Sequence, residues 1–324
     1  MDLKKREMAE KVSILYYEKD KSQNEIAEEL GISRSYVSQL LSFAREAGIV
    51  KITINVDEFS MRMIRKDFVF KAKFPKLRSV YIMSSISEEY TQANLGKFAA
   101  PYVADMINDS NVIGINLGAS VEKTVNSLET QSFSNSGSRK VVQIMGGFNN
   151  NEVYATHPNE IVKKLGSILN CDYYYLNGPV IVEQPELRKA LMKENSIKQV
   201  TDLWDDIDLA IMGIGVADDR SKLFKLFNSD MTAKIRKSKV CGELNINFFD
   251  IKGGYVPLIE EHKISIPYDK LKNINKKVVI CSGEYKSEAI LGALRGGMID
   301  VLVTDSATIE SVEKLIEMED GEKV

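Results

Sequence analysis

The stretch RSYVSQLL, residues 34–41, carries an arginine, a glutamine and three hydroxyl groups at positions that a helix would expose. Arginine pairs well with guanine and glutamine with adenine, whereas hydroxyl groups suit phosphate oxygens. A second arginine follows further along and could meet a phosphate backbone. We therefore predict a surface that contacts duplex DNA, made of Ser33, Arg34, Ser35, Tyr36, Ser38, Gln39 and Arg45.

The residues around this surface have the spacing of a helix-turn-helix. Ser22 and Glu25 are spaced as a capping box at the start of one helix, and Gly31 suits the positive φ of a sharp turn. Ser33 can then cap a second helix. The buried face of that helix would consist of Val37, Leu40 and Leu41. The alternative is an ordinary helical hairpin with a solvated polar face, and the number of satisfied offsets favours DNA binding.

The charges of this region argue for more than one copy of the chain. The whole chain has a formal net charge of −3, and the charges in residues 1–52 balance to about zero. Non-specific attraction of a single copy to DNA should therefore be modest. A weak single module normally works as a dimer or higher oligomer that reads repeated half-sites, so we expect a homo-oligomer.

The composition indicates a reduced, water-soluble environment. The chain has 324 residues, of which 44% are hydrophobic and 27% charged, as in ordinary proteins with a sizeable core. Its three cysteines, Cys171, Cys241 and Cys281, lie far apart and have no metal-ligand spacing. The start of the chain lacks the apolar segment of a signal peptide, and no apolar run approaches the length of a membrane span. We expect a cytoplasmic protein without metal or cofactor.

The rest of the chain alternates between apolar runs and helical patterns. Strand-like runs lie at 80–83, 111–117, 140–145, 173–178, 209–215, 276–283 and 300–305. Helix-like segments between most of them lie at 88–109, 120–129, 157–169, 186–194, 284–295 and 306–318. This alternation predicts an α/β fold with a doubly wound, mainly parallel sheet. We predict a helix-turn-helix domain over 1–54, an amphipathic connector over 55–75 and a larger domain over 76–324.

At this point the sequence resembles the SorC-type (sugar-binding) bacterial transcription regulators. The head segment NEIAEELGISRSYVSQLLSFAREAGIVKI is similar to theirs, and seven further motifs follow in the family's order. These motifs are IGINLGASVEKTV, VVQIMGGFN, NEIVKKLG, YYLNGPVIV, LAIMGIG, CGELNINFFD and EAILGALRGGMIDVLVTD. The resemblance implies a tetramer and an effector domain similar in fold to sugar-phosphate isomerases and deaminases. It also implies that a phosphorylated sugar or related metabolite alters operator affinity.

The same resemblance implies an effector site at the strand ends. The loop Gly118–Ala119–Ser120 follows a strand and opens a helix, where backbone N–H groups could hold a phosphate. Lys286 matches a family lysine that resembles a phosphate ligand, and Glu243 matches an acidic position suited to sugar hydroxyls. Their plainer roles would be a solvated lysine and a strand-edge salt bridge. The remaining expected members are Gln143, Gly146, Gly147 and Asn149 at one strand end, and Pro179 and Gly213 as pocket walls.

Two positions depart from the family pattern. The phosphate loop commonly reads Gly-Arg-Thr in the family, and its middle position is Ala119 here. A charge-assisted contact is therefore either missing or supplied from elsewhere. Some relatives carry a lysine before the Gly-Gly pair that forms an imine with an aldehyde sugar. That position is Met145 here, so we expect no covalent effector.

We expect a DNA-binding repressor of a carbohydrate-utilisation operon, controlled by a phosphorylated sugar or sugar alcohol. The alternative is an isomerase- or deaminase-like enzyme with a helical appendage. Such an enzyme needs a general acid and base placed against the sugar, and no carboxylate–histidine pairing in the sequence suggests them, so we predict no catalytic residues. A third alternative is an oligomerisation module that binds no ligand.

Overall fold

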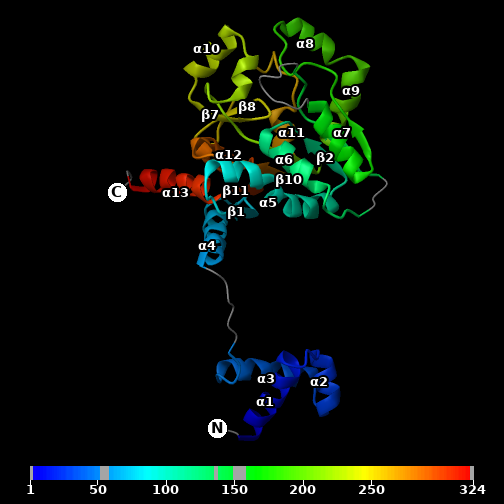
Figure 1. Cartoon of the computed structure of the whole chain (residues 1–324), viewed down its shortest axis with the longest axis vertical. Coiled ribbons are helices and arrows are strands. Elements are labelled where there is room, and N and C mark those ends of the chain that lie inside the picture. The colour runs from blue at the N-terminus through cyan, green and yellow to red at the C-terminus, as the bar shows by residue number, and fades with distance from the viewer. Residues whose placement is uncertain (1–2, 52–57, 135–137, 149–157, 322–324) are drawn as a thin grey trace. The chain divides into compact units, whose positions relative to one another are not determined.

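The computed structural model describes residues 3–51, 58–134, 138–148 and 158–321. The chain divides into two compact units, Met1–Glu58 and Phe59–Val324. Figure 1 shows the elements of each unit. The predicted boundary between residues 54 and 55 lies outside the described residues. Within the described ranges, no helix is long and apolar enough to cross a membrane.

The first unit is a bundle of three helices: α1 (Leu3–Tyr17), α2 (Gln23–Leu30) and α3 (Arg34–Glu46). α2 begins at a capping box, in which the Glu25 N–H donates to Ser22 Oγ (3.3 Å) and the Ser22 N–H donates to the Glu25 carboxylate (2.8 Å). Gly31 ends α2 with φ +64° and turns the chain into α3. The core consists of Ala9, Val12, Ile26, Val37, Leu40, Leu41 and Ala44. These features confirm the predicted helix-turn-helix.

The second unit is built on a seven-stranded sheet in which all neighbouring strands are parallel. The spatial order is β1–β11–β10–β5–β2–β3–β4. The strands are β1 (Ser79–Met83), β2 (Val112–Ile115), β3 (Lys140–Gln143), β4 (Asp172–Tyr174), β5 (Leu209–Met212), β10 (Lys276–Ile280) and β11 (Val301–Asp305). Each lies within or beside a predicted strand-like run, because buried parallel strands read as apolar runs in sequence.

Helices cover both faces of this sheet, as the α/β pattern predicts. One face packs against α5 (Glu88–Asn108), α6 (Ala119–Leu128) and α7 (Pro158–Leu169). The other face packs against α4 (Glu58–Lys73), α9 (Asn195–Thr201), α11 (Tyr268–Asn273), α12 (Ser287–Arg295) and α13 (Ser306–Gly321). The prediction of a doubly wound, mainly parallel sheet is confirmed.

A second, antiparallel sheet was not predicted. Its order is β6–β7–β8–β9, and its strands are β6 (Gly215–Val216), β7 (Val240–Leu244), β8 (Asn247–Asp250) and β9 (Tyr255–Val256). The apolar run 209–215 was taken as one strand, but the chain leaves the large sheet after Met212 and enters the small sheet at Gly215. The remaining elements are α8 (Pro185–Leu191), α10 (Ser229–Lys237), η1 (Asp202–Asp205), η2 (Lys222–Leu226) and η3 (Glu284–Lys286).

The segment expected as a connector, 55–75, is largely helix α4. Met63, Phe70 and Phe74 are buried in the core of the second unit. The described part of this segment is therefore packed as an element of the larger domain.

Replacing Gly31 by alanine should destabilise the first unit by about 1 kcal/mol. An alanine Cβ would meet no atom within 4 Å, so the loss comes from holding a non-glycine residue at φ +64°. Calorimetry of the full chain should show a lower melting temperature for the head transition. Asn24→Ala, at an exposed position in α2, is the control and should change it little. Equal melting of Gly31→Ala and the parent chain would contradict this account of the turn.

Candidate functional site

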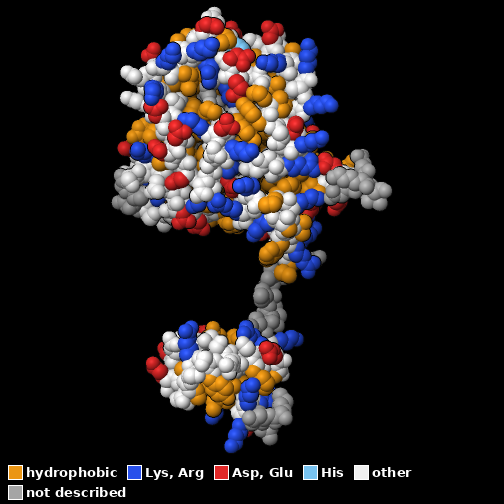
Figure 2. All heavy atoms as spheres, turned by 180° about the vertical axis from the view of Figure 1, so that it is seen from behind, with side chains coloured by type: hydrophobic (Ala, Val, Ile, Leu, Met, Phe, Trp, Pro, Cys, Tyr) orange, Lys and Arg blue, Asp and Glu red, His pale blue; other side chains and the backbone are white. Residues whose placement is uncertain are grey.

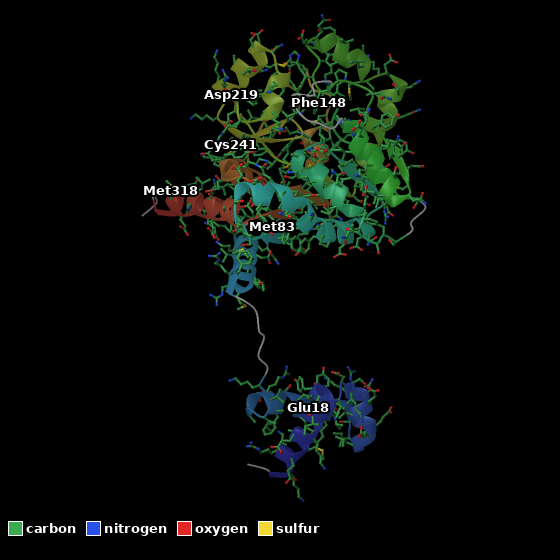
Figure 3. All side chains as sticks on the ribbon, in the orientation of Figure 1. Glu18, Met83, Phe148, Asp219, Cys241 and Met318 are labelled. Atoms are coloured by element: carbon green, nitrogen blue, oxygen red, sulfur yellow. The ribbon has the colours of Figure 1, made fainter. Side chains whose placement is uncertain are left out.

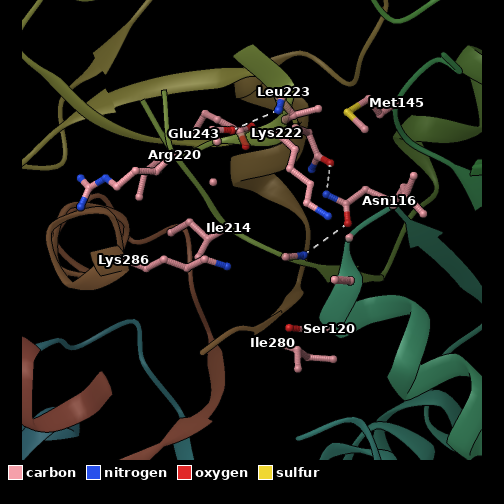
Figure 4. Close-up of a pocket in the computed structure, with 18 of the residues that line it drawn as sticks. Asn116, Ser120, Met145, Ile214, Arg220, Lys222, Leu223, Glu243, Ile280 and Lys286 are labelled. Atoms are coloured by element: carbon pink, nitrogen blue, oxygen red, sulfur yellow. Dashed lines mark hydrogen bonds between the residues drawn. The ribbon is translucent and has the colours of Figure 1, made fainter. Parts of the chain in front are cut away.

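A pocket lies at the carboxyl ends of β2, β5 and β10, between the large sheet and the small one. Parallel strands place their carboxyl ends on one edge, where open α/β sheets bind ligands. Figure 4 shows the pocket with its lining side chains. Six of the predicted effector residues line it: Gly118, Ala119, Ser120, Gly213, Glu243 and Lys286. Met145, the position at which a lysine would form an imine, also lies in the lining.

The start of α6 forms one wall of the pocket. Gly118 is the N-cap residue in an extended conformation, and no side chain caps the helix there. The first N–H groups of α6 and the Ser120 side chain lie at the pocket. A helix start of this kind favours a negatively charged group, because its N–H groups and dipole point outward.

Glu243 supplies a buried carboxylate. It is 5% exposed, and its Oε2 accepts a hydrogen bond of 2.7 Å from the Ile246 N–H. Burial raises the pKa of Glu243, while the Ile246 N–H and the positive charges of Lys286 and Lys263 act in the opposite direction. Gly215 lies directly against this carboxylate, and a Cβ there would collide with it. Glu243 can accept hydrogen bonds from a ligand that replaces lost water.

Two asparagines link the strand ends that surround the pocket. Asn116 Nδ2 donates to Asn245 Oδ1 (2.7 Å), and the Gly213 N–H donates to Asn116 Oδ1 (3.3 Å). Both side chains are buried and both residues line the pocket. The network therefore fixes amide groups next to the Glu243 carboxylate.

Asn245 is presented by a tight turn between β7 and β8. Asn245 and Ile246 have φ values of +53° and +58°, as in the two-residue hairpin turns that require both central residues to be left-handed. Such a conformation is strained for isoleucine. Ser265 Oγ donates to Asn245 O (2.6 Å), and Lys263 Nζ donates to Ile246 O (3.2 Å). With the Ile246–Glu243 bond, these contacts hold the turn in place.

Three cationic side chains reach the pocket from separate segments. Lys222 and Lys286 extend their amines toward the space above Ser120 and Ile280, as Figure 4 shows. Arg220 turns its guanidinium away from that space and pairs with Asp218 (2.5 Å). The pocket therefore combines two lysine amines and a helix start with one buried carboxylate and two amides, a set that suits an anionic, hydroxyl-rich molecule.

Four other predicted effector residues do not line this pocket. Gln143 is buried, where it donates to Met145 O (2.6 Å) and accepts from the Leu176 N–H (2.9 Å). Gly146 and Gly147 cross the segment around Pro179 so closely that a Cβ on Gly146 would meet its backbone at 2.8 Å. In this structure these glycines allow backbone to approach backbone. Asn149 lies outside the described residues.

The predicted DNA-contacting residues lie on and beside α3. Ser33 caps this helix by accepting a hydrogen bond from the Tyr36 N–H (3.2 Å), and Tyr36 packs partly against the core. The remaining five are exposed: Arg34, Ser35, Ser38, Gln39 and Arg45. The exposed face carries the base-reading candidates on one side of a helix whose opposite side is buried.

Sequence reasoning missed Asn116, Asn245, Arg220 and Lys222 as pocket residues. Asn116 directly precedes the predicted Leu117–Gly118 turn, and Asn245 stands in a quoted motif, so position at a strand end was a usable signal. The segment that carries Lys222 has no pattern that relates it to a strand end, since it reaches the pocket through the unpredicted small sheet.

Comparison with known proteins identifies both units. A family model for a putative sugar-binding domain matches residues 62–313, and a model for sigma-70 region 4 matches residues 11–47. The sorbitol operon regulator of Klebsiella pneumoniae is 31% identical over 310 residues, which cover 94% of this chain and 96% of that protein. The deoxyribonucleoside regulator of Bacillus subtilis (strain 168) is 26% identical and covers 96% of this chain and 99% of that protein.

The crystal structure of the full-length sorbitol operon regulator SorC from Klebsiella pneumoniae has the same fold. It aligns with a TM-score of 0.70 at 30% identity, over 96% of this chain and 98% of that one. These relatives are named as regulators, and the isomerase- or deaminase-like alternative finds no support among them. The chain belongs to the SorC-type family of sugar-binding transcription regulators.

Proposed function

We propose that this chain is a cytoplasmic repressor of a carbohydrate-utilisation operon, and that a phosphorylated sugar or sugar alcohol bound in the pocket lowers its affinity for the operator. The observation that carries the proposal is the joint presence of Lys222, Lys286 and the α6 start with Glu243 in one pocket. The first group suits a phosphate and the second suits hydroxyl groups. The names of the two relatives, which refer to sorbitol and to deoxyribonucleosides, support a hydroxyl-rich effector.

In this proposal the phosphate lies at the α6 start. Ala119 removes the side-chain charge that the family loop commonly carries, and Lys222 and Lys286 supply positive charge from two other segments. Charge-assisted hydrogen bonds to a phosphate are roughly twice as strong as neutral ones. Glu243 and Asn245 then accept and donate hydrogen bonds at the polyol end.

Regulation follows from linkage between two arrangements of a homo-oligomer, which we take to be a tetramer. One arrangement spaces two recognition helices for adjacent half-sites, and the other does not. The effector shifts this equilibrium only by the difference in its affinity for the two arrangements.

Lys286→Ala should weaken binding of the phosphorylated effector roughly 10- to 100-fold, because a charge-assisted hydrogen bond contributes about 1.5–3 kcal/mol. A thermal-shift panel should pair sugar phosphates and sugar-alcohol phosphates with their unphosphorylated parents. A phosphorylated member should raise the melting temperature of the parent chain and raise it less in Lys286→Ala and in Lys222→Ala.

The matched control is Lys193→Ala, which removes an exposed lysine outside the pocket and should leave the shift unchanged. If the unphosphorylated parents stabilise the chain as well as the phosphates do, the phosphate assignment is wrong.

Arg34→Ala and Gln39→Ala should each weaken operator binding by about 1–3 kcal/mol if each side chain makes a bidentate base contact. Electrophoretic mobility shift with promoter fragments from the gene's own neighbourhood measures this loss. Lys189→Ala removes one exposed positive charge from α8 and should change operator affinity little. Effector affinity should be the same in all three variants, and loss of effector binding in Arg34→Ala would contradict the division of roles.

Glu243→Gln should remove a pH dependence of stability. Because burial raises the pKa of Glu243 above its ordinary 4.5, the folded state holds its proton longer than the unfolded state. The carboxyl group therefore lowers the free energy of unfolding progressively as pH rises from about 4.5 to its folded pKa. Urea unfolding at a series of pH values should show the parent chain losing stability relative to Glu243→Gln over this range. A difference that is constant with pH would refute the raised pKa.

A further inference from the structure

Helix α4 has apolar side chains on two opposite faces. On one face, Met63 and Phe70 are 8% and 2% exposed and pack into the core of the second unit. On the other face lie Met61, Ile64, Phe68 and Val69, which are 40%, 46%, 65% and 59% exposed. A helix that is apolar on both sides is normally covered on both sides. The second unit covers only one of them.

The four exposed residues form a continuous surface, here called the α4 stripe (Met61, Ile64, Phe68 and Val69). Their spacing of i, i+3, i+7 and i+8 places them along one side of the helix. They are four of the thirteen large hydrophobic side chains exposed in the described chain, and one 16-residue helix carries them all. Figure 2 shows hydrophobic side chains gathered on this helix. Concentrated apolar surface of this kind marks an interaction site, unlike single scattered residues.

The rim of the stripe is polar, and its charges are balanced within the chain. Three basic side chains of α4 are paired with carboxylates, two of which lie on α13: Arg62 with Glu310, Lys66 with Glu313, and Lys71 with Asp67. Another α4 helix can therefore approach the stripe against reduced like-charge repulsion. On α13 Met318 is 65% exposed near the end of the helix, as Figure 3 shows, and adds apolar surface on the same element.

The connection to the head indicates which partner covers the stripe. Eleven residues separate the end of α3 at Glu46 from the start of α4 at Glu58, and such a segment spans at most about 40 Å when fully extended. Adjacent half-sites on DNA lie roughly 34–36 Å apart. Two heads tethered to one pair of α4 helices can thus reach both half-sites. The choice of a second copy as occupant rests on the proposed DNA-binding function.

We infer that the α4 stripe packs against the same stripe of a second copy of this chain, in a two-fold interface that keeps two heads within reach of adjacent half-sites. A two-fold interface brings the same patch of both subunits together. Apolar contacts form its centre, and the ion pairs between α4 and α13 lie at its rim.

Light scattering on the purified full chain, without DNA, tests the inference. The parent chain should have a molar mass that is a multiple of 36.4 kDa, and Ile64→Asp combined with Phe68→Asp should reduce that mass by half. The matched control is Leu187→Asp, at a position on α8 that is 50% exposed, and its mass should equal that of the parent. A monomeric parent chain, an unchanged mass in the double variant or an equal loss in the control would overturn the inference.

A milder substitution covers the case in which the double variant fails to fold. Val69→Cys should react slowly with a maleimide at high protein concentration and several-fold faster after dilution, with the modified residue identified by peptide mass spectrometry. Leu187→Cys should react at one rate throughout. Slow labelling of Val69→Cys at every dilution would show that the chain covers its own stripe, and fast labelling at every concentration would show that nothing does; either result overturns the inference. A chain that assembles through the stripe but ignores every promoter fragment would instead refute the proposed function.

Discussion

The parallel pairing of β5 between β2 and β10 is the constraint on which the candidate site depends. Register pairs Ile113 with Leu209 and Lys276 with Leu209 across the three strands, so all three chains leave the sheet at nearly the same level. The α6 start, the Gly213 crossing and the η3 segment with Lys286 are thereby brought to one edge. The hydrogen bond from the Gly213 N–H to Asn116 fastens two of these exits together. Neither the phosphate-type contacts nor the buried carboxylate could meet without it.

Much of this arrangement could be predicted from sequence, because local signals and tertiary structure agree. The capping box, Gly31 and the alternating apolar runs each specify an element on their own, and the elements formed where expected. The site residues that sequence reasoning placed correctly in the pocket, such as Gly118 and Lys286, stand at the ends of predicted elements. Strand ends on a parallel sheet share an edge whatever the length of the helices between them.

The small antiparallel sheet could not be predicted on the same grounds. Two of its strands have only two residues, which is too short for any alternation to show. The run through Met212 and Ile214 is apolar throughout, so nothing in it marks the change of sheet at Gly213. Lys222 was missed for the same reason. Gln143, by contrast, was misplaced because a strand-end polar residue can equally bond to backbone, as it does with Leu176. Residue type and position do not decide between a ligand and a neighbouring loop.

The turn at Asn245 and Ile246 restricts how ligand preference can diverge among relatives. Since both residues hold left-handed backbone, a replacement at Asn245 must tolerate that conformation as well as suit the bound molecule. Asparagine, aspartate and glycine meet this condition, whereas β-branched residues do not. Adaptation at this position is therefore confined to a few small side chains, and larger changes in selectivity must come from residues on freer backbone, such as Lys222.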